Sequence, residues 1–434
     1  MGVNLTASDA RHLLRRVGYG GRHDEIANLT GASRADAVAI ATSTSGSTDA
    51  DAIPPVAGER RTAERRLLAR WWVDQMVASP APVVERLTYF WHSHFACTSD
   101  RVKDQRAMRD QHRLLRTHGL GPFRVLLQQV ALDPAMLIDL DNASNVAGDE
   151  QENFARELME LYTIGNGMFS EDEVIAMARA WTGHNLDRKS EPPRYRFRAD
   201  RHDAQNKTLF GITRNWDGPE TIDELVDGSR RDQTAWFMAT KLWREFGDPG
   251  WASAELITHL ADRFKATDGN ALEVVRALCL RDEFWATERR YAVVKQPIAW
   301  VAEIERRTGQ RLSNGVLDAR SSVMGQQLYL PPSVAGWGHN QAWLASTAVL
   351  GRARVARDLA KPAQQSGFLR GLRDQTPTVA ADRLLDSFGV PDASDRTRAN
   401  VIDWCRDARD ELGDVWFERE AFRYGALLPE VNLA

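Results

Sequence analysis

The sequence predicts a mainly α-helical protein, organised as one large multi-helix domain with a small β-hairpin insertion. Three observations support this fold class. Apolar residues recur with helical spacing along most of the 434 residues. Helix-capping side chains such as Thr6 and Ser8 precede these segments. The period-two alternation that is typical of a strand is clear at only one place.

The first helix is expected to follow the cap at Thr6 or Ser8 and to end at Gly18 and Gly20. Residues 42–58 are rich in Ser, Thr, Asp, Gly and Pro, and we expect a flexible loop there. Ser79 and Pro80 begin another helix, which carries Trp91. The other helical patterns occupy residues 34–41, 59–76, 102–117, 123–132, 150–164, 171–182, 232–246, 252–264, 271–280, 295–307, 348–359, 379–388 and 398–411.

A β-hairpin is expected at about residues 195–211. Residues 195–200 alternate with period two, residues 201–206 are typical of a turn, and residues 207–211 supply the second strand. We therefore expect residues 1–365 to form the main helical domain, with the loop and the hairpin as its irregular parts. The composition loosens at about residues 366–378, so residues 366–434 are interpreted as a C-terminal helical extension packed on that domain.

The composition excludes several classes of protein. The net charge of -4 comes from 56 basic and 60 acidic side chains spread along the chain, which argues against nucleic-acid binding. No signal peptide and no 18-residue apolar run is present, so we expect a cytoplasmic protein without a membrane segment. Cys97, Cys279 and Cys405 fit reduced thiols. Walker, dinucleotide-binding, zinc-protease and serine-hydrolase motifs are missing, which removes support for those reactions.

The segment at residues 150–164 concentrates its charges on one side. On a wheel of about 100° per residue, Glu152, Asn153, Arg156, Glu157 and Glu160 fall on one arc, with apolar residues opposite. One interpretation is a surface helix with two ion pairs four residues apart. In the other interpretation the carboxylates face inward, where they need a metal ion or an arginine partner.

Histidines mark two further segments. His92 and His94 lie among aromatic residues, and they can chelate one metal ion if the backbone is extended there, but they diverge on a helix. His202 and Asp203 lie at the predicted hairpin turn, with Lys207 four residues on, where the simpler interpretation is a polar turn. Residues 325–343 form an irregular loop dense in Gly, Pro and Trp, which either walls a site or packs over the core.

Eight spaced motifs resemble the bacterial family catalogued as domain of unknown function 1800, and they cover nearly the whole chain. These are HLLRRVGYG (residues 12–20), FWHSHF (90–95), PAMLIDLDN (134–142), ENFARELMELYTIG (152–165), ARAWTG (178–183), HDxxxK (202–207), KxP (295–297) and PPxVxGW (331–337). The resemblance implies an exported protein whose gene often lies beside that of a sulfatase-like partner. The missing export signal departs from that pattern.

Two residues also depart from the family pattern. His184 stands where an aromatic residue is usual, and Ala299 replaces a usual Glu two positions after the proline of the KxP motif. The first change adds a candidate ligand, and the second removes a polar contact. The resemblance makes the Glu152–Glu160 set more specific than a solvated helix face requires, but it supplies no reaction.

The leading hypothesis is a metal-dependent enzyme that acts on a small molecule. Oxidation of an organic substrate is favoured, because carboxylates on helices, together with histidines, build oxygen-activating sites. Metal-assisted hydrolysis is the first alternative. A non-catalytic binding or assembly protein, with a possible partner from a neighbouring gene, is the second. The expected metal (iron, manganese or zinc) has His92, His94, Glu152, Glu157, His184 and His202 as ligands, and the expected catalytic residues are Arg156, Glu160, Asp203 and Lys207.

Overall fold

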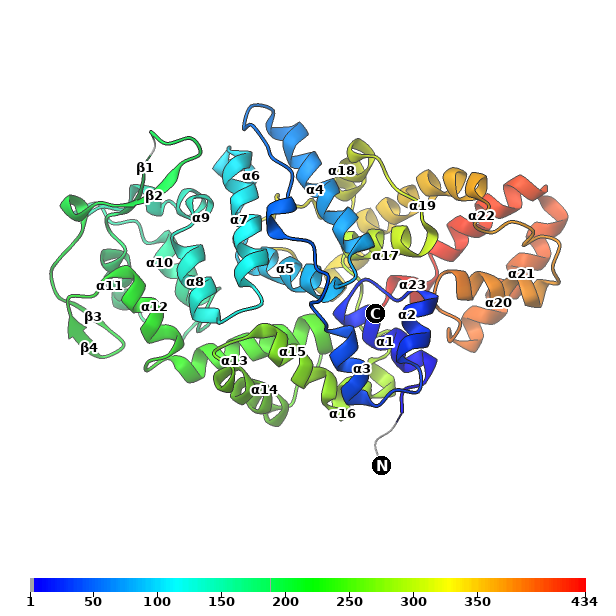
Figure 1. Ribbon diagram of the computed structural model, residues 1–434, viewed down its shortest axis with the longest axis horizontal. Coiled ribbons are helices and arrows are strands. Elements are labelled where there is room, and N and C mark those ends of the chain that lie inside the picture. Colours follow the sequence, from blue (N-terminus) through cyan, green and yellow to red (C-terminus); the bar gives the residue numbers. More distant parts are fainter. Residues whose placement is uncertain (1–3, 188) are drawn as a thin grey trace.

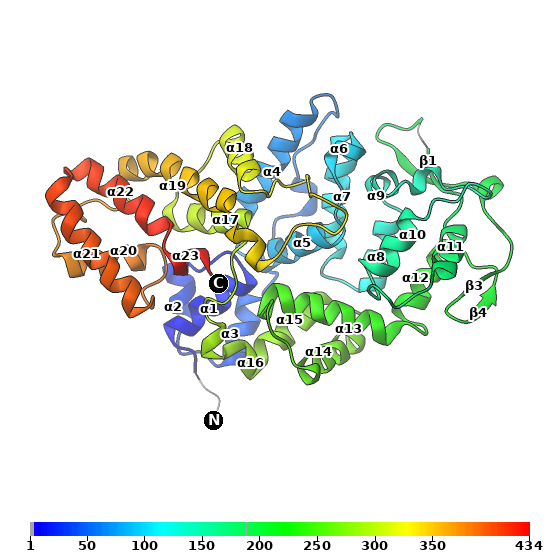
Figure 2. The ribbon, with the colours of Figure 1, turned by 180° about the vertical axis from the view of Figure 1, so that it is seen from behind.

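A computed structural model describes residues 4–187 and 189–434 and confirms the mainly α-helical fold (Figure 1). The molecule is elongated, with the strands at one end and α20–α22 at the other (Figures 1 and 2). The N-terminal and central helices are α1 Ala7–Val17, α2 His23–Leu29, α3 Arg34–Ala41, α4 Arg61–Ala78, α5 Pro82–His94, α13 Arg231–Leu242, η4 Trp243–Gly247, α14 Ala254–Ala266, α15 Ala271–Leu280, α16 Asp282–Trp285, α17 Pro297–Thr308 and α18 Asn314–Val323.

The remaining elements form the two ends. The strand-bearing end contains α6 Ser99–Val102, α7 Gln105–His118, α8 Phe123–Ala131, α9 Pro134–Asp139, α10 Asn153–Glu160, α11 Glu171–Ala180, α12 Gly218–Val226 and the strands β1 His184–Asp187, β2 Arg194–Phe197, β3 Lys207–Leu209 and β4 Ile212–Arg214. The other end contains α19 Ser346–Ser366, α20 Pro377–Ser387, α21 Asp395–Glu411, α22 Asp414–Ala426 and α23 Pro429–Asn432. Short 3₁₀ turns lie at Ala50–Ala52, Asn142–Ser144, Ala199–Arg201, Thr287–Arg289 and Asn340–Leu344.

Helix α5 lies at the centre of the fold. It begins at Pro82, in the first turn where proline is tolerated, and nearly all of its residues are buried. A helix that is buried on every side needs neighbours all round, and α5 contacts α1, α4 and α7. One continuous core of buried apolar side chains extends from Leu5 to Val431, so the C-terminal helices share it with the rest of the chain.

The predicted hairpin is wrong in its pairing. Both predicted strand segments are strands, but β2 pairs with β1 and β3 pairs with β4, so they form two separate antiparallel sheets. The turn between β3 and β4 has Phe210 at φ 54° and Gly211 at φ 80°. Positive φ at both central residues is what a tight two-residue hairpin turn requires. Phe210 gave no turn signal in the sequence, because bulky residues seldom adopt positive φ.

The loop at residues 42–58 is irregular apart from the short turn at Ala50–Ala52. It packs along α7, since Ile53 is buried and its carbonyl accepts a hydrogen bond from Arg109. The three cysteines are buried and unpaired, in agreement with the expected thiols. Within the described part of the chain, no helix has both the length and the apolar character needed to cross a bilayer.

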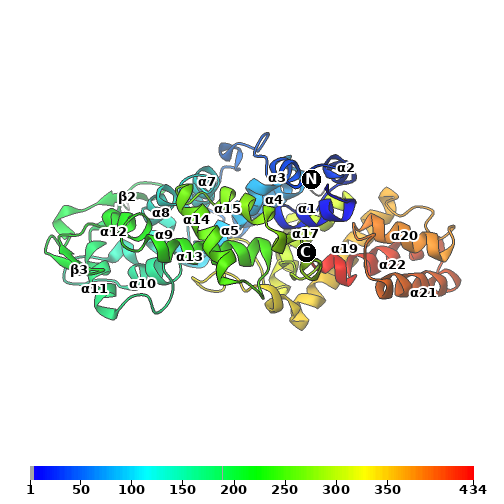
Figure 3. The ribbon, with the colours of Figure 1, turned by 90° about the horizontal axis from the view of Figure 1, so that it is seen from below.

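The C-terminal helices α20–α22 pack beside α19, and the chain then returns to the middle of the molecule through α23 (Figure 3). There Ala434 and Val293 exchange backbone hydrogen bonds of 2.8 and 3.1 Å. The last residues therefore lie against the segment that leads into α17.

Candidate functional site

The acidic segment forms a surface helix. Helix α10 covers Asn153–Glu160 and is shorter than the predicted helix at residues 150–164. Arg156 pairs with Glu152 at 3.3 Å and with Glu171 at 2.7 Å, and both carboxylates are exposed. Burial and the nearby charge of Glu160 raise the pKa of Glu157 above its ordinary value. The charged arc therefore lies at the surface, as the ion-pair interpretation predicts, but the second partner of Arg156 is Glu171 of α11 rather than a residue four positions on.

His92 and His94 do not form a chelating pair, because α5 continues to His94 and turns the two rings to different sides. His92 Nε2 accepts the backbone N–H of Tyr329 at 3.1 Å, and its ring lies 5.3 Å from that of Trp337. His94 is enclosed by aromatic rings, with Phe90 stacked on it. Burial lowers the pKa of His92 to about 3 and that of His94 well below its ordinary value. Both imidazoles are neutral parts of the core.

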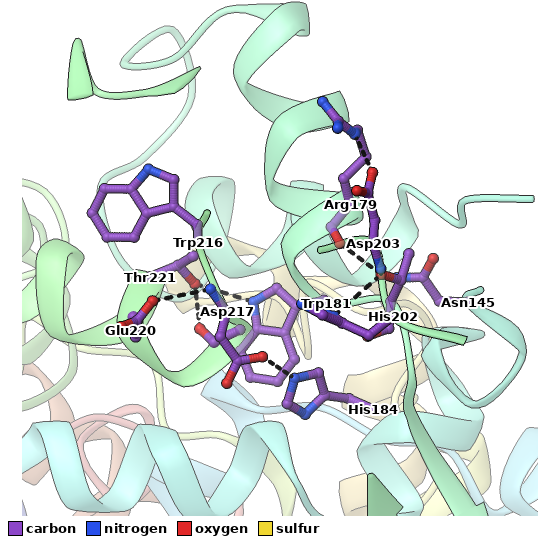
Figure 4. A network of polar contacts seen from close by, with 12 residues as sticks. Asn145, Arg179, Trp181, His184, His202, Asp203, Trp216, Asp217, Glu220 and Thr221 are labelled. Atoms are coloured by element: carbon purple, nitrogen blue, oxygen red, sulfur yellow. Dashed lines mark hydrogen bonds and ion pairs between the residues drawn. The ribbon is translucent and has the colours of Figure 1, made fainter. Parts of the chain in front are cut away.

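Four predicted site residues do come together beside the two sheets: His184, His202 and Asp203, which Figure 4 shows, and Lys207, which donates to the Asp203 carbonyl. We call His184, His202, Asp203, Lys207 and Asp217 the β-sheet network. His184 hydrogen-bonds the Asp217 carboxylate through Nε2 at 3.0 Å and the Tyr195 hydroxyl through Nδ1 at 3.0 Å. The His202 ring lies 6.4 Å from the ring of His184. Burial opposes ionisation of Asp217, but the hydrogen bond and charge of His184 hold its pKa below the ordinary value.

Asp203 and Lys207 connect separate segments of the chain within this network. Arg179 donates to Asp203 Oδ2 at 2.6 Å, and the backbone N–H of Asp203 donates to the Thr182 hydroxyl at 2.8 Å. The buried Lys207 ammonium donates to the Asp203 carbonyl and, at 2.9 Å, to Asn215 Oδ1 and the Trp216 carbonyl. Burial lowers the pKa of Lys207. All three N–H groups of this ammonium are engaged by the chain itself, so Lys207 joins β3 to the segment that enters α12.

The predicted metal ligands lie in three places: α5, α10 and the β-sheet network. Across residues 4–187 and 189–434, no group of three or more His, Cys, Asp and Glu side chains is arranged to hold a metal ion. His184 and Asp217, the closest to such a set, are hydrogen-bonded to each other. In this arrangement the six side chains do not fit a single metal site.

A pocket at the centre of the molecule brings together residues that are far apart in sequence. It is lined by residues from α1 and the turn after it, α5, η4, α17 and the loop before Asn340, among them Arg15, Tyr19, Arg86, Glu245, Lys295, Glu303 and His339. Its empty volume is about 490 Å³, which includes its open mouth. A space of this size suits a small ligand. We call it the central pocket.

Glu245 forms one wall of the central pocket. It lies on η4, a five-residue π-helical turn (Trp243–Gly247), and such turns occur frequently at functional sites. Its carboxylate accepts from Arg86 Nη2 at 2.9 Å and from Gln296 Nε2 at 3.2 Å. His339 Nδ1 lies 3.6 Å from the same carboxylate. These contacts hold a buried negative charge at the pocket wall.

Glu303 forms a second buried ion pair. It accepts from Lys295 Nζ at 2.7 Å and from Arg307 Nε at 3.3 Å. Gly20, at φ 73°, leaves the room for it, because a Cβ there would lie 2.7 Å from Glu303 Oε1. Lys295 also donates to the Val431 carbonyl at 2.9 Å. Burial lowers the pKa of Lys295 to about 8.

Three buried side chains of the central pocket keep donors without a partner among the described residues. They are Arg15 (Nε and Nη2), Arg86 (Nη1) and Tyr19 (Oη). A buried donor without an acceptor costs about 1–3 kcal/mol, so water or a ligand is expected to complete it. Other buried arginines, such as Arg116, also leave nitrogens unpartnered. In the central pocket, however, three residues that carry such donors line one cavity.

Sequence reasoning did not identify this pocket. Arg15, Tyr19 and Lys295 lie within motifs that were recognised, but nothing indicated that those motifs meet in space. His339 and Asn340 belong to the Gly-, Pro- and Trp-rich loop, which walls this site as one interpretation predicted. Arg86 and Glu245 carried no sequence signal. The spacing of residues within one helix does not reveal which distant segments contact each other in the fold.

The comparisons with known proteins give a family but no activity. A family model described as protein of unknown function (DUF1800) matches residues 12–417. No curated protein matches the chain. No solved structure matches it either.

Proposed function

The chain belongs to the DUF1800 family, whose description assigns no activity, and we therefore propose a function from its geometry: it binds a small anionic molecule in the central pocket. The ligand class is a compact molecule with a carboxylate, sulfate or phosphate group. The observation that supports this proposal is that Arg15, Arg86 and Tyr19, three buried residues with unpartnered donors, all line one cavity.

The charges of the central pocket favour an anion. Four basic side chains line it, Arg15, Arg86, Arg244 and Lys295, against the two carboxylates of Glu245 and Glu303. Arginine presents a planar fork of donors that matches oxyanions, and charge-assisted hydrogen bonds of this kind are about twice as strong as neutral ones. An anion would thus offset the excess positive charge of the lining.

The proposal is tested by titrating the protein with sulfate, succinate and acetate at constant ionic strength. Calorimetry gives the affinity, and thermal unfolding followed by circular dichroism gives the stabilisation, which is about 2.7 kcal/mol at about 100 times Kd. We expect at least one of these anions to bind, and Arg15→Gln to weaken binding about tenfold or more, because a charge-assisted contact is lost.

Arg116→Gln is the matched control, since Arg116 is equally buried and also has unpartnered nitrogens but lies outside the central pocket. It should lower stability and leave the affinity within about twofold of that of the wild-type protein. If none of the anions changes the unfolding temperature beyond the effect of matched sodium chloride, the proposal fails.

Ala299 supplies an independent test, because it lines the same pocket. Ala299→Glu should lower anion affinity about tenfold by placing a negative charge beside the ligand. Ala299→Gln has nearly the same volume without the charge and should bind like the wild-type protein or a few-fold more weakly. Equal losses in both variants would mean that crowding, not charge, controls the site.

The small-molecule ligand expected from the sequence is retained in this proposal. The metal-dependent oxidation or hydrolysis, the cytoplasmic location and the partner from a neighbouring gene stay predictions. Elemental analysis of protein purified without a chelating tag tests the metal. A content far below one equivalent for every transition metal, unchanged on reconstitution, would remove it.

A further inference from the structure

His339 lies at the mouth of the central pocket and is the one histidine in its lining. Its side chain is 49% exposed, whereas Glu245 beside it is only 5% exposed. The separation of 3.6 Å between His339 Nδ1 and Glu245 Oε2 places the imidazole next to a carboxylate, with its other side open to solvent. A histidine changes its charge near neutral pH, so this ring can exchange a proton with water.

The loop that carries His339 is held firmly on the core. The Trp337 ring packs 5.3 Å from that of His92, and the backbone N–H of Val294 donates to Asn340 Oδ1 at 2.9 Å. Gly336, at φ 80°, approaches the Ser93 carbonyl so closely that a Cβ there would lie 2.2 Å from that oxygen. The loop therefore fixes the position of the imidazole relative to the pocket on both sides of residue 339.

The charged residues that line the pocket together with His339 come from several elements. They are Glu245 and Arg244 of η4, Arg86 of α5, Arg15 of α1, Lys295 before α17 and Glu303 within α17. Glu245 favours the imidazolium, but its charge is already shared with Arg86. The remaining excess of positive charge disfavours a further cation in the free pocket. An anion in the pocket removes that excess and favours protonation.

We infer that binding of a small anion in the central pocket is coupled to uptake of one proton by His339. This inference rests on the proposed function. The proton comes from solvent, and the resulting imidazolium contributes its charge to the site beside the Glu245 carboxylate. Linkage requires the reverse as well, so protonation of His339 strengthens anion binding by the same factor. His339 is then the residue that can pass a proton to or from the bound molecule.

The coupling is measured by calorimetric titration in buffers of different ionisation enthalpy, because the slope of the observed enthalpy against that quantity counts the protons taken up. Sulfate is the probe, since it does not titrate between pH 6 and pH 8, and succinate is used at pH 7 and above if sulfate does not bind. We expect fractional uptake approaching about one proton per anion near neutral pH. His339→Gln should abolish this uptake near pH 7 while the anion still binds, with affinity reduced about two- to tenfold.

His23→Gln is the control variant, because His23 is an exposed histidine that lies outside the central pocket. Its proton uptake should equal that of the wild-type protein. If the wild-type protein binds the anion without proton uptake, or if the uptake persists in His339→Gln, the inference is overturned while the proposed function stands. If none of sulfate, succinate and acetate binds to the wild-type protein, both fail.

Discussion

The β-sheet network and the central pocket both contain buried charged side chains, but they differ in what completes them. In the network, Lys207 uses its three N–H groups on acceptors of the chain, and His184 uses both ring nitrogens. In the pocket, Arg15, Arg86 and Tyr19 keep donors without a partner among the described residues. A buried charge therefore occurs both in structural clusters and in binding sites. Donors that lack an acceptor, on residues that line a cavity, distinguish the binding site.

The largest effect is expected in the network. Lys207→Met should lower the free energy of unfolding by about 3 kcal/mol, because it removes three hydrogen bonds of a buried ammonium and leaves the buried Trp216 carbonyl without this donor. Urea unfolding measures this loss, and Lys361→Met, at an exposed position, should change stability by less than about 0.5 kcal/mol. A loss of stability below about 1 kcal/mol for Lys207→Met would mean that the three hydrogen bonds of Lys207 are dispensable. Complete hydrogen bonding would then no longer distinguish the β-sheet network from the central pocket.

An intermediate effect is expected from pH in the central pocket. Burial lowers the pKa of Lys295 to about 8, so its ammonium is charged below that pH and loses its charge above it. Anion affinity should thus fall about tenfold between pH 7 and pH 9, because one attractive charge disappears. Calorimetry with sulfate in the His339→Gln background isolates this effect from the proton taken up by His339.

Lys295→Met in the same background is the companion variant. It should bind sulfate about tenfold more weakly at pH 7 and show little further change up to pH 9. Glu303 retains Arg307 as a partner in this variant. If the His339→Gln protein, which retains Lys295, binds sulfate with equal affinity at pH 7 and pH 9, the Lys295 ammonium does not contribute to anion binding.

The smallest effect is expected on α10. Arg156→Ala should cost less than about 0.5 kcal/mol of stability, because its two ion pairs are exposed. Anion affinity should not change, since Arg156 does not line the central pocket. A loss of stability above about 1 kcal/mol in urea unfolding would show that these ion pairs contribute more than exposed pairs usually do.

Local patterns predicted most of the helices and none of the pocket. The cap at Thr6 and the apolar repeat of α1 act within one helix, so they can be read from neighbouring residues. The sequence does not predict the turn between β3 and β4, because the positive φ of Phe210 depends on its packing partners rather than on its residue type. Arg15 and Lys295 are 280 residues apart, and each resembles an ordinary surface cation in the sequence. Only packing brings them to one cavity.

The π-helical turn at Trp243–Gly247 makes the position of Glu245 depend on the number of residues in the helix. Loss of one residue there would restore α-helical spacing and rotate the following side chains by about 100°. Glu245 would then leave Arg86 and Gln296, while α13 before it could keep its packing. A single deletion in this turn should thus displace one wall of the central pocket without a change in any side chain that lines it.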